Sequence, residues 1–263
     1  MNAYLIWLYL IPTWLLGFLI VGSLTALSVA GLYLVRPWVS RHRHPGNDVV
    51  FSFAGATGVI YALVLGLFAV ATWDSLKAAE DIASKEAFQI GKLNLDLSGY
   101  ANEDRDHLRP MLKQYLERII NVEWPMQRRG LDADDPPVLS EMMTYWLRVE
   151  PKTEGQRVVH GEALGQLNEL LSLRRARQAA VHSQLPPPMW AVVILGAILN
   201  IGISYLITTE HTTMHALMVG FLAAMIGVMI YVIVAVDHPM WGAVSVGTES
   251  YQGVLTHMGS WRN

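Results

Sequence analysis

The sequence predicts an all-α membrane protein with four transmembrane helices, arranged as two plus two, and a helical polar domain inserted between spans 2 and 3. Two observations lead to this fold class. Charge is distributed unevenly, because 15 of the 19 Lys and Arg and 18 of the 22 Asp and Glu lie between Asp74 and Leu185. The rest of the 263-residue chain is nearly uncharged and contains four long apolar runs. This pattern excludes a simple soluble globule, a disordered chain and a collagen-like repeat.

Each of the four apolar runs has the length of a membrane span. A bilayer core of about 30 Å needs about 20 apolar residues in a helix. The runs cover residues 1–35, 49–73, 189–209 and 214–236, and none of them contains Asp, Glu, Lys or Arg. The first run could instead be a signal peptide. It lacks a basic segment before the apolar stretch, and the stretch is longer than the apolar region of a signal peptide. We therefore favour a retained span.

These runs divide the chain into four parts: a first transmembrane pair, a helical extramembrane domain, a second transmembrane pair and a C-terminal tail. The expected ranges are 1–73, 74–187, 188–237 and 238–263. Three consecutive prolines, 186–188, separate the polar domain from the third span.

The polar insert is expected to be mostly α-helical and to continue the second span without a break at Trp73. Apolar residues recur there at intervals of three and four residues, which is the period of an amphipathic helix. This face consists of Leu76, Ala79, Ala83, Ala87, Ile90, Leu93 and Leu97.

Three further helices are expected in the insert. The first follows Gly99 and ends at Trp124-Pro125, and its apolar face consists of Leu108, Leu112, Tyr115, Ile119 and Val122. A loop at 125–137 follows, because this segment contains Asp134-Asp135-Pro136-Pro137. A short helix at 138–149 and a long one at 155–185 complete the insert.

Basic residues near the span ends give a preferred orientation in the membrane. Arg36, Arg41 and Arg43 lie in the loop between the first two spans, whereas the N-terminus before the first span has none. By the positive-inside tendency, this loop would be cytoplasmic and the insert extracytoplasmic. Lys and Arg on the insert side of the second and third spans favour the reverse orientation. Long inserts cross the membrane largely regardless of charge and the first span usually dominates, so we favour the extracytoplasmic insert.

Composition and motifs limit the kinds of binding and catalytic site that the chain can contain. The net charge of −3 gives no basic footprint for nucleic acid, and the absence of Cys excludes thiolate sites. No motif for a catalytic nucleophile, a phosphate-binding loop or a cofactor is present, so the sequence predicts no enzyme and no cofactor. His211 and His215 lie four residues apart and are weak metal candidates. The alternative interpretation is two histidines at the membrane interface.

The second span carries two neighbouring ridges of different character. Small residues at every fourth position let helices approach closely in lipid; they are Ala54, Gly58, Ala62 and Gly66. Beside them lie Val59, Leu63 and Leu67. In a symmetric oligomer these aliphatic side chains would form a narrow constriction that gates by dewetting. The alternative interpretation is that they face lipid or a core.

Two groups of residues together point to a known family. The first consists of residues 58–66 (GVIYALVLG), Trp73-Asp74 and the Ala- and Glu-rich helix that follows. The second consists of Arg174-Arg175-Ala176-Arg177, Leu185-Pro186, Met189-Trp190, Gly196-Ala197, Tyr205, His215, Asp237-His238-Pro239, Gly242 and Glu249. Both groups resemble the bacterial bestrophin-like domain family, and the second follows its order and spacing.

The resemblance implies a distant link to bestrophins, which are pentameric anion channels with the same span order. It places the apolar neck of those channels on Val59, Leu63 and Leu67, with Leu where the neck has aromatic residues. The acidic calcium clasp of the eukaryotic members has no counterpart here. The resemblance further implies that the chain forms a homo-oligomer of five copies in the lipid bilayer of the bacterial inner membrane. It also implies that this oligomer conducts inorganic anions such as chloride.

Two functions from different classes are compatible with these observations. The first is an oligomeric ion channel, anion-conducting, in which Arg174, Arg175 and Arg177 attract anions to the pore mouth. Interfacial anchoring is the alternative role of these arginines. The second function is a non-conducting membrane scaffold or sensor whose helical domain binds a protein partner. Ion flux through liposomes separates the two.

Overall fold

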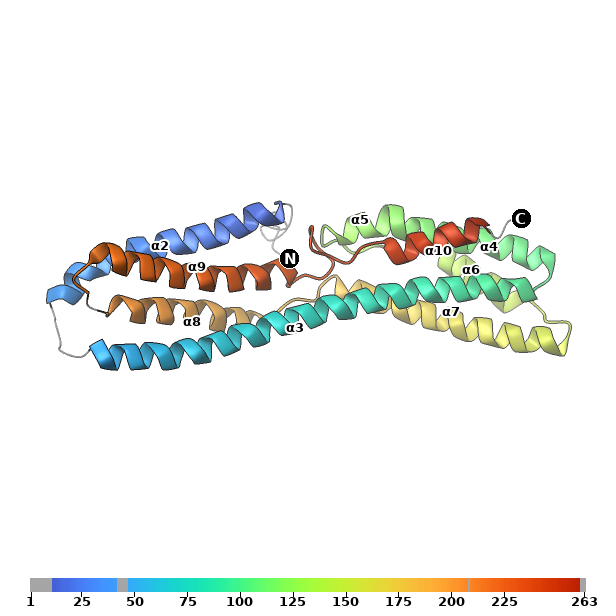
Figure 1. The fold of residues 1–263 in the computed structure, drawn as a ribbon. Helices are drawn as coiled ribbons and strands as arrows, with labels where there is room; N and C mark the ends of the chain where they lie inside the picture. The colour runs from blue at the N-terminus through green and yellow to red at the C-terminus, as the bar shows by residue number, and fades with distance from the viewer. Residues whose placement is uncertain (1–10, 42–46, 208, 261–263) are drawn as a thin grey trace. The chain divides into compact units, whose positions relative to one another are not determined.

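The structure is a computed structural model that describes residues 11–41, 47–207 and 209–260, and within these ranges it contains helices and no β-strand (Figure 1). The predicted all-α class is therefore confirmed. The chain divides into two units. The span unit comprises residues 1–75 and 184–238, and the polar unit comprises residues 76–183 and 239–263. Arg43 of the expected cytoplasmic loop and the first ten residues of the expected first span lie outside the described residues.

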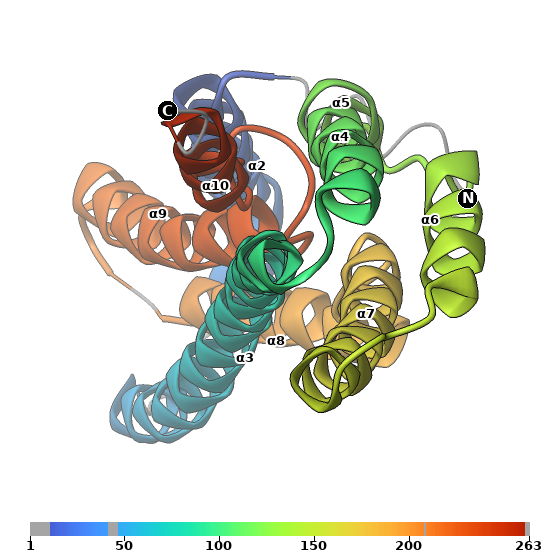
Figure 2. The same cartoon turned by 90° about the vertical axis from the view of Figure 1, so that its right-hand side faces the viewer.

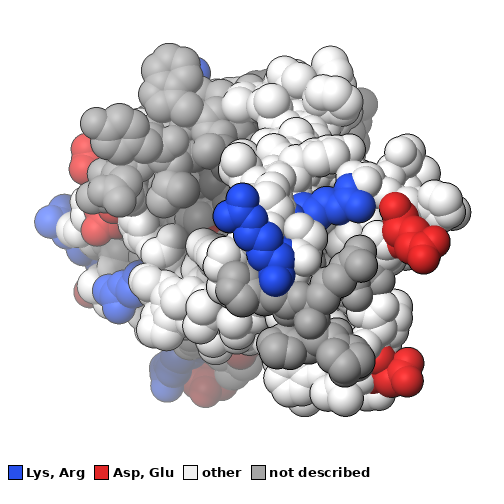
Figure 3. Space-filling view, turned by 90° about the vertical axis from the view of Figure 1, so that its left-hand side faces the viewer, with Lys and Arg blue, Asp and Glu red and all other residues white. Residues whose placement is uncertain are grey.

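The span unit holds the four helices that are long and apolar enough to cross a membrane among the residues described. They are α2 (Thr13–Arg41), the first part of α3 (Asn47–Asp96), α8 (Pro187–Tyr205) and α9 (Thr212–Val236). α2 begins directly after Pro12, whose carbonyl accepts the first backbone hydrogen bonds of the helix. Figure 3 shows the end of this unit where α2 is followed by α3; a few charged side chains stand out there from a surface of uncharged residues.

Small residues allow the helices of the span unit to pack closely. A Cβ added at Gly227 of α9 would lie 3.1 Å from the Cα of Val21 on α2, and one at Gly17 would lie 3.2 Å from the ring of Tyr231. Backbones that approach this closely gain dispersion contacts, the main attraction between helices in lipid. The buried core between the helices comprises Tyr61, Leu65, Leu185, Val193, Ala197, Ile201, Ala223, Ile226 and Ile233.

α3 is one uninterrupted helix from Asn47 to Asp96, so the second span continues into the insert without a break at Trp73, as predicted. A single 3-10 turn, Leu97–Gly99, ends it. Ala79, Ala83, Ala87, Ile90 and Leu93 of the predicted apolar face are buried.

In the polar unit, three helices supply side-chain partners to the second half of α3: α4 (Asn102–Arg118), α7 (Glu154–Ala180) and α10 (Glu249–Ser260). A further helix, α6 (Pro137–Arg148), packs against α4 and lies away from α3 (Figure 2). A capping box starts α7: the Thr153 hydroxyl accepts from the Gln156 amide, and the Gln156 side chain accepts from the Thr153 amide. Fully buried side chains of this core include Leu93, Leu97, Leu108, Leu112, Leu116, Trp146, Leu167 and Leu170.

The second helix of the insert differs from the expectation. It does not end at Trp124-Pro125 but passes through a π-helical turn, Ile119–Glu123, into the short α5 (Trp124–Gln127). Pro125 accounts for the wider turn, because its ring would clash with the carbonyl four residues earlier in a regular α-helix. The extra residue shifts the register by one. Val122, expected on the apolar face, is 43% exposed, while Glu123 is fully buried.

The segment expected to be a C-terminal tail also has a defined structure. Residues 239–260 belong to the polar unit and end in α10. A bend precedes that helix, in which the indole N–H of Trp241 donates to the Val181 carbonyl. Gly130 has a φ of 69° and lies against the Trp241 ring, which a Cβ at that position would meet. The last turn of the long helix, expected at 185, is at Ala180.

Candidate functional site

The three aliphatic residues of the expected neck lie on one exposed face of α3. Val59, Leu63 and Leu67 are 71%, 64% and 60% exposed. Tyr61 and Leu65 lie on the other side of the helix and are buried in the core of the span unit. An α-helix turns about 100° per residue, so Val59 and Leu67 differ by only about 80° in direction. The described residues leave this aliphatic ridge exposed, so that lipid or another subunit can cover it.

The neighbouring small-residue ridge is also almost unused within one chain. A Cβ added at Gly66 would meet no atom within 4 Å, and one at Gly58 would meet only the Asn200 side chain, at 3.8 Å. Ala62 is exposed and Ala54 is partly exposed. If Ala54, Gly58, Ala62 and Gly66 form a packing surface, its partner is therefore outside the chain.

The close contact that α3 makes inside the chain was missed by the sequence analysis and lies on α8. Gly196 faces the ring of Tyr61, and a Cβ there would collide with that ring. The Tyr61 hydroxyl donates to the Val193 carbonyl over 2.7 Å. This contact fixes the rotation of α3 in the span unit, and so determines that Leu63 and Leu67 point away from the other helices.

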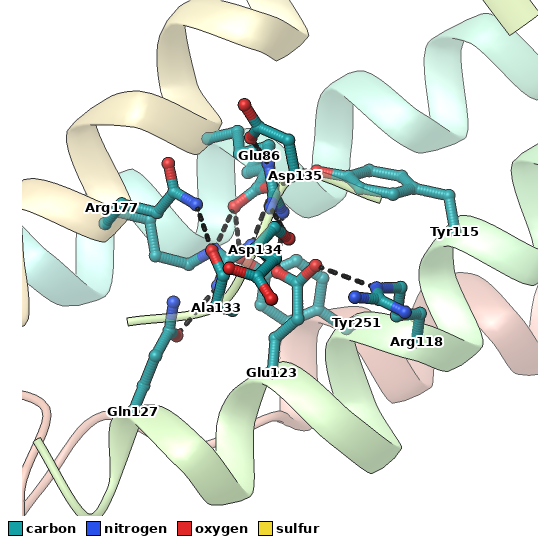
Figure 4. A network of polar contacts seen from close by, with 12 residues as sticks. Glu86, Tyr115, Arg118, Glu123, Gln127, Ala133, Asp134, Asp135, Arg177 and Tyr251 are labelled. Carbon is teal, nitrogen blue, oxygen red and sulfur yellow. Dashed lines mark hydrogen bonds and ion pairs between the residues drawn. The ribbon is translucent and has the colours of Figure 1, made fainter. Parts of the chain in front are cut away.

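A buried charge network occupies the polar unit (Figure 4). Arg177 of α7 is its centre, and its side chain is fully buried. Its Nε donates to Glu86 Oε2 of α3 over 2.6 Å, and its Nη2 donates to Glu123 Oε2 over 2.9 Å. Its Nη1 donates to Gln127 Oε1 over 2.7 Å. One guanidinium thus joins three helical segments.

Arg174, one turn earlier on α7, completes the charge balance. Its Nη1 donates to Glu123 Oε2 over 2.6 Å, and its Nη2 donates to the Asp134 carbonyl over 3.1 Å. Two buried arginines therefore face two buried glutamates, Glu86 and Glu123. Such a neutral arrangement is needed because an unpaired buried charge is very unfavourable.

Two tyrosines complete the hydrogen bonding of Glu86. Tyr115 of α4 donates to Oε1 over 2.7 Å, and Tyr251 of α10 donates to Oε2 over 2.8 Å. Burial, reinforced by the Glu86 charge, raises the pKa of both phenols well above their ordinary value, so both stay protonated donors. Burial alone would lower the pKa of Arg177, but its buried partners, Glu86 foremost, together more than offset this effect and raise that pKa well above its ordinary value.

These contacts revise the expected role of the three arginines. Arg174 and Arg177 are 2% and 1% exposed and are neutralised by carboxylates, so they do not present free charge to an ion. Arg175 lies between them on the exposed side of α7. Of these three arginines, only Arg175 presents an exposed charge.

Sequence reasoning missed the network because its carboxylates are remote from the arginines in the chain. One signal was present. Glu86 lies three residues after Ala83 and four before Ile90, which puts it on the apolar face of the amphipathic pattern. A carboxylate on a buried face needs a cationic partner. No such signal marks Glu123, whose burial depends on the π-turn.

The two histidines considered as metal ligands lie in different surroundings. His215 is buried, and its Nε2 donates to the Ser204 carbonyl over 2.9 Å. His211 is exposed and precedes the first turn of α9. Within the described part of the chain, no group of three His, Cys, Asp or Glu side chains is placed to hold a metal ion.

Comparison with known proteins adds a family and a fold. Residues 22–251 match the family described as the Bestrophin-like domain. Two crystal structures of a bacterial bestrophin homologue from Klebsiella pneumoniae, each with one substitution, have TM-scores of 0.68 at 11% identity, covering 92% of this chain and 98% of that chain. A crystal structure of a membrane protein is similar with a TM-score of 0.68 at 10% identity, covering 91% and 97%. No curated protein matches the chain in sequence.

Proposed function

The chain belongs to the bestrophin-like domain family, and from this premise we propose that it is an oligomeric ion channel with α3 innermost. The observation that carries the proposal is the aliphatic ridge Val59, Leu63 and Leu67, which is exposed in the single chain although it lies on a span. Around a symmetry axis, copies of this ridge would form an apolar constriction. An ion must shed hydration water to pass it, and the wall offers no polar group in exchange.

The proposed assembly is a homo-oligomer in the bacterial inner membrane, and the number five comes from the resemblance to bestrophins. The small-residue ridge supports assembly, because Gly66 lies open on the surface of the span unit and would let a neighbouring helix approach closely. A closed ring also agrees with the preference of membrane and soluble homo-oligomers for cyclic symmetry.

Conduction of anions such as chloride, which the resemblance implies, has less support from the residues. The arginines expected at the pore mouth are internal ion pairs, with the exception of Arg175. The charge of the permeating ion must therefore be inferred from the charged side chains that flank the aliphatic ridge on α3.

Flux through proteoliposomes tests the proposal. Replacing Leu63 and Leu67 together with Ala should widen the constriction and raise ion flux about tenfold, which corresponds to a barrier lowered by about 1.4 kcal/mol. The matched control replaces Leu195 and Leu199 of α8 with Ala; these leucines are 57% and 55% exposed and also lie four residues apart. The control should conduct like the wild type.

Two results would contradict the channel. One is an intact oligomer in which neither the wild type nor the Leu63→Ala, Leu67→Ala variant conducts any ion, and this result would favour the non-conducting scaffold or sensor. The other is an equal rise in flux for the α8 control, which would show that the aliphatic ridge of α3 is not special.

A further inference from the structure

The aliphatic ridge of α3 does not end at Leu67. Counting about 100° per residue, Val70 and Asp74 each lie within about 20° of Leu63 in direction. Val70 is 58% exposed, and Asp74 is exposed as well. Asp74 is thus the first charged side chain that follows the proposed constriction, about 10 Å beyond Leu67 along the helix axis.

The charged side chains on the span part of α3 are all negative. Between Asn47 and Leu76 the helix contains no Lys or Arg, and its two charged residues are Asp48 and Asp74. Asp48 lies in the first turn, within about 20° of Val59 in direction. The apolar ridge is therefore bounded by a carboxylate at each end.

We propose that Asp74 is the residue that determines ion selectivity, and that the channel prefers cations. The inference rests on the proposed function, because only a ring of copies brings several Asp74 carboxylates together around one axis. Such a ring raises the local concentration of cations and lowers that of anions. The preference is opposite to the one that the resemblance implies.

Other charged side chains on α3 follow Asp74. Lys77 follows within one turn and lies within about 20° of Val59, so it is the residue best placed to offset the carboxylate. Asp81 and Lys85 come later and neutralise each other in an exposed ion pair of 2.6 Å. Asp74 precedes all of these and is nearest to Leu67, and its short side chain keeps the charge close to the backbone.

The test is the reversal potential of purified protein in a planar bilayer under a potassium chloride gradient. It is measured in the wild type and in the Leu63→Ala, Leu67→Ala background, which is expected to conduct more. Asp74→Asn should reduce the potassium-to-chloride permeability ratio by about tenfold. Glu80→Gln is the matched control, since Glu80 is exposed on the same helix but points about 100° away from Leu63. It should leave the ratio unchanged.

Lys77→Gln tests the opposite change, because it removes a positive charge where Asp74→Asn removes a negative one. It should raise the potassium preference or leave it unchanged, because it removes the nearest positive charge.

Results that overturn the selectivity proposal are distinct from those that overturn the channel. A conducting wild type that prefers chloride, or a potassium preference unaffected by Asp74→Asn, refutes the role of Asp74 while the channel stands. A Glu80→Gln variant that loses selectivity equally would do the same, because only general surface charge would then matter. If no variant conducts, the channel itself fails and the inference fails with it.

Discussion

At the scale of single residues, the polar unit depends on Arg177. Its guanidinium contacts Glu86, Glu123 and Gln127, which come from three helical segments. Replacing a whole buried ion pair with apolar residues is often tolerated, whereas removing one partner leaves an uncompensated charge. The network is therefore most sensitive to single substitutions, and Tyr115 and Tyr251, held as neutral donors to Glu86, cannot replace the lost charge.

Arg177→Met is expected to lower the free energy of unfolding of the polar unit by about 3–5 kcal/mol, because Glu86 and Glu123 would remain buried with one cation too few. Arg175→Met, on the exposed side of the same helix, should change it by less than about 0.5 kcal/mol. Thermal or denaturant unfolding in mild detergent, followed by circular dichroism, measures both. Equal effects of the two substitutions would show that the network does not stabilise the unit.

The sequence reveals less at this scale than at any other. Arg174 and Arg177 stand out as candidates, but their partners are 51 and 91 residues away in the chain, and no local spacing predicts such pairs. Because the π-turn contains one extra residue, Glu123 is buried and Val122 is exposed, which is the reverse of the predicted pattern. A strict 3.6-residue period cannot anticipate that shift.

At the scale of helices, hydrophobic period and length predict almost everything. The four spans, the continuity of α3 through Trp73 and the short helix near 138–149 all follow from apolar patterns. α10 was not predicted, because it is short and depends on contacts such as Tyr251 with the network. The positions of glycines in the sequence do not by themselves show which of them makes a close helix contact within the chain. Gly66 belongs to a regular small-residue ridge yet meets nothing in the chain, whereas Gly196 makes the close contact.

This difference predicts separate effects for two glycine substitutions. Gly66→Leu should leave the fold of a single chain intact and weaken assembly, since the added side chain blocks only an external partner. Gly196→Leu should destabilise the chain itself by more than about 1–3 kcal/mol, because it collides with Tyr61.

Light scattering and thermal unfolding in detergent separate assembly from stability for these variants. Gly22→Leu is the control, as a Cβ at Gly22 on α2 also meets no atom within 4 Å. A Gly66→Leu protein that assembles as well as Gly22→Leu would remove the small-residue ridge from the proposed interface.

At the scale of the whole molecule, the span unit leaves much apolar surface on α3 uncovered. Lipid can cover such a surface, and so can further copies of the chain. In the proposed assembly, further copies cover it, with α3 innermost and with Val59, Leu63 and Leu67 facing the symmetry axis.

Electron microscopy of the detergent-purified protein tests this arrangement most directly. We expect a closed ring of identical subunits, five by resemblance to bestrophins, with α3 nearest the axis. The narrowest part of its central pore is expected to be lined by Val59, Leu63 and Leu67, with Asp74 beyond it. A monomer, or a ring in which these three side chains face lipid, would contradict the account.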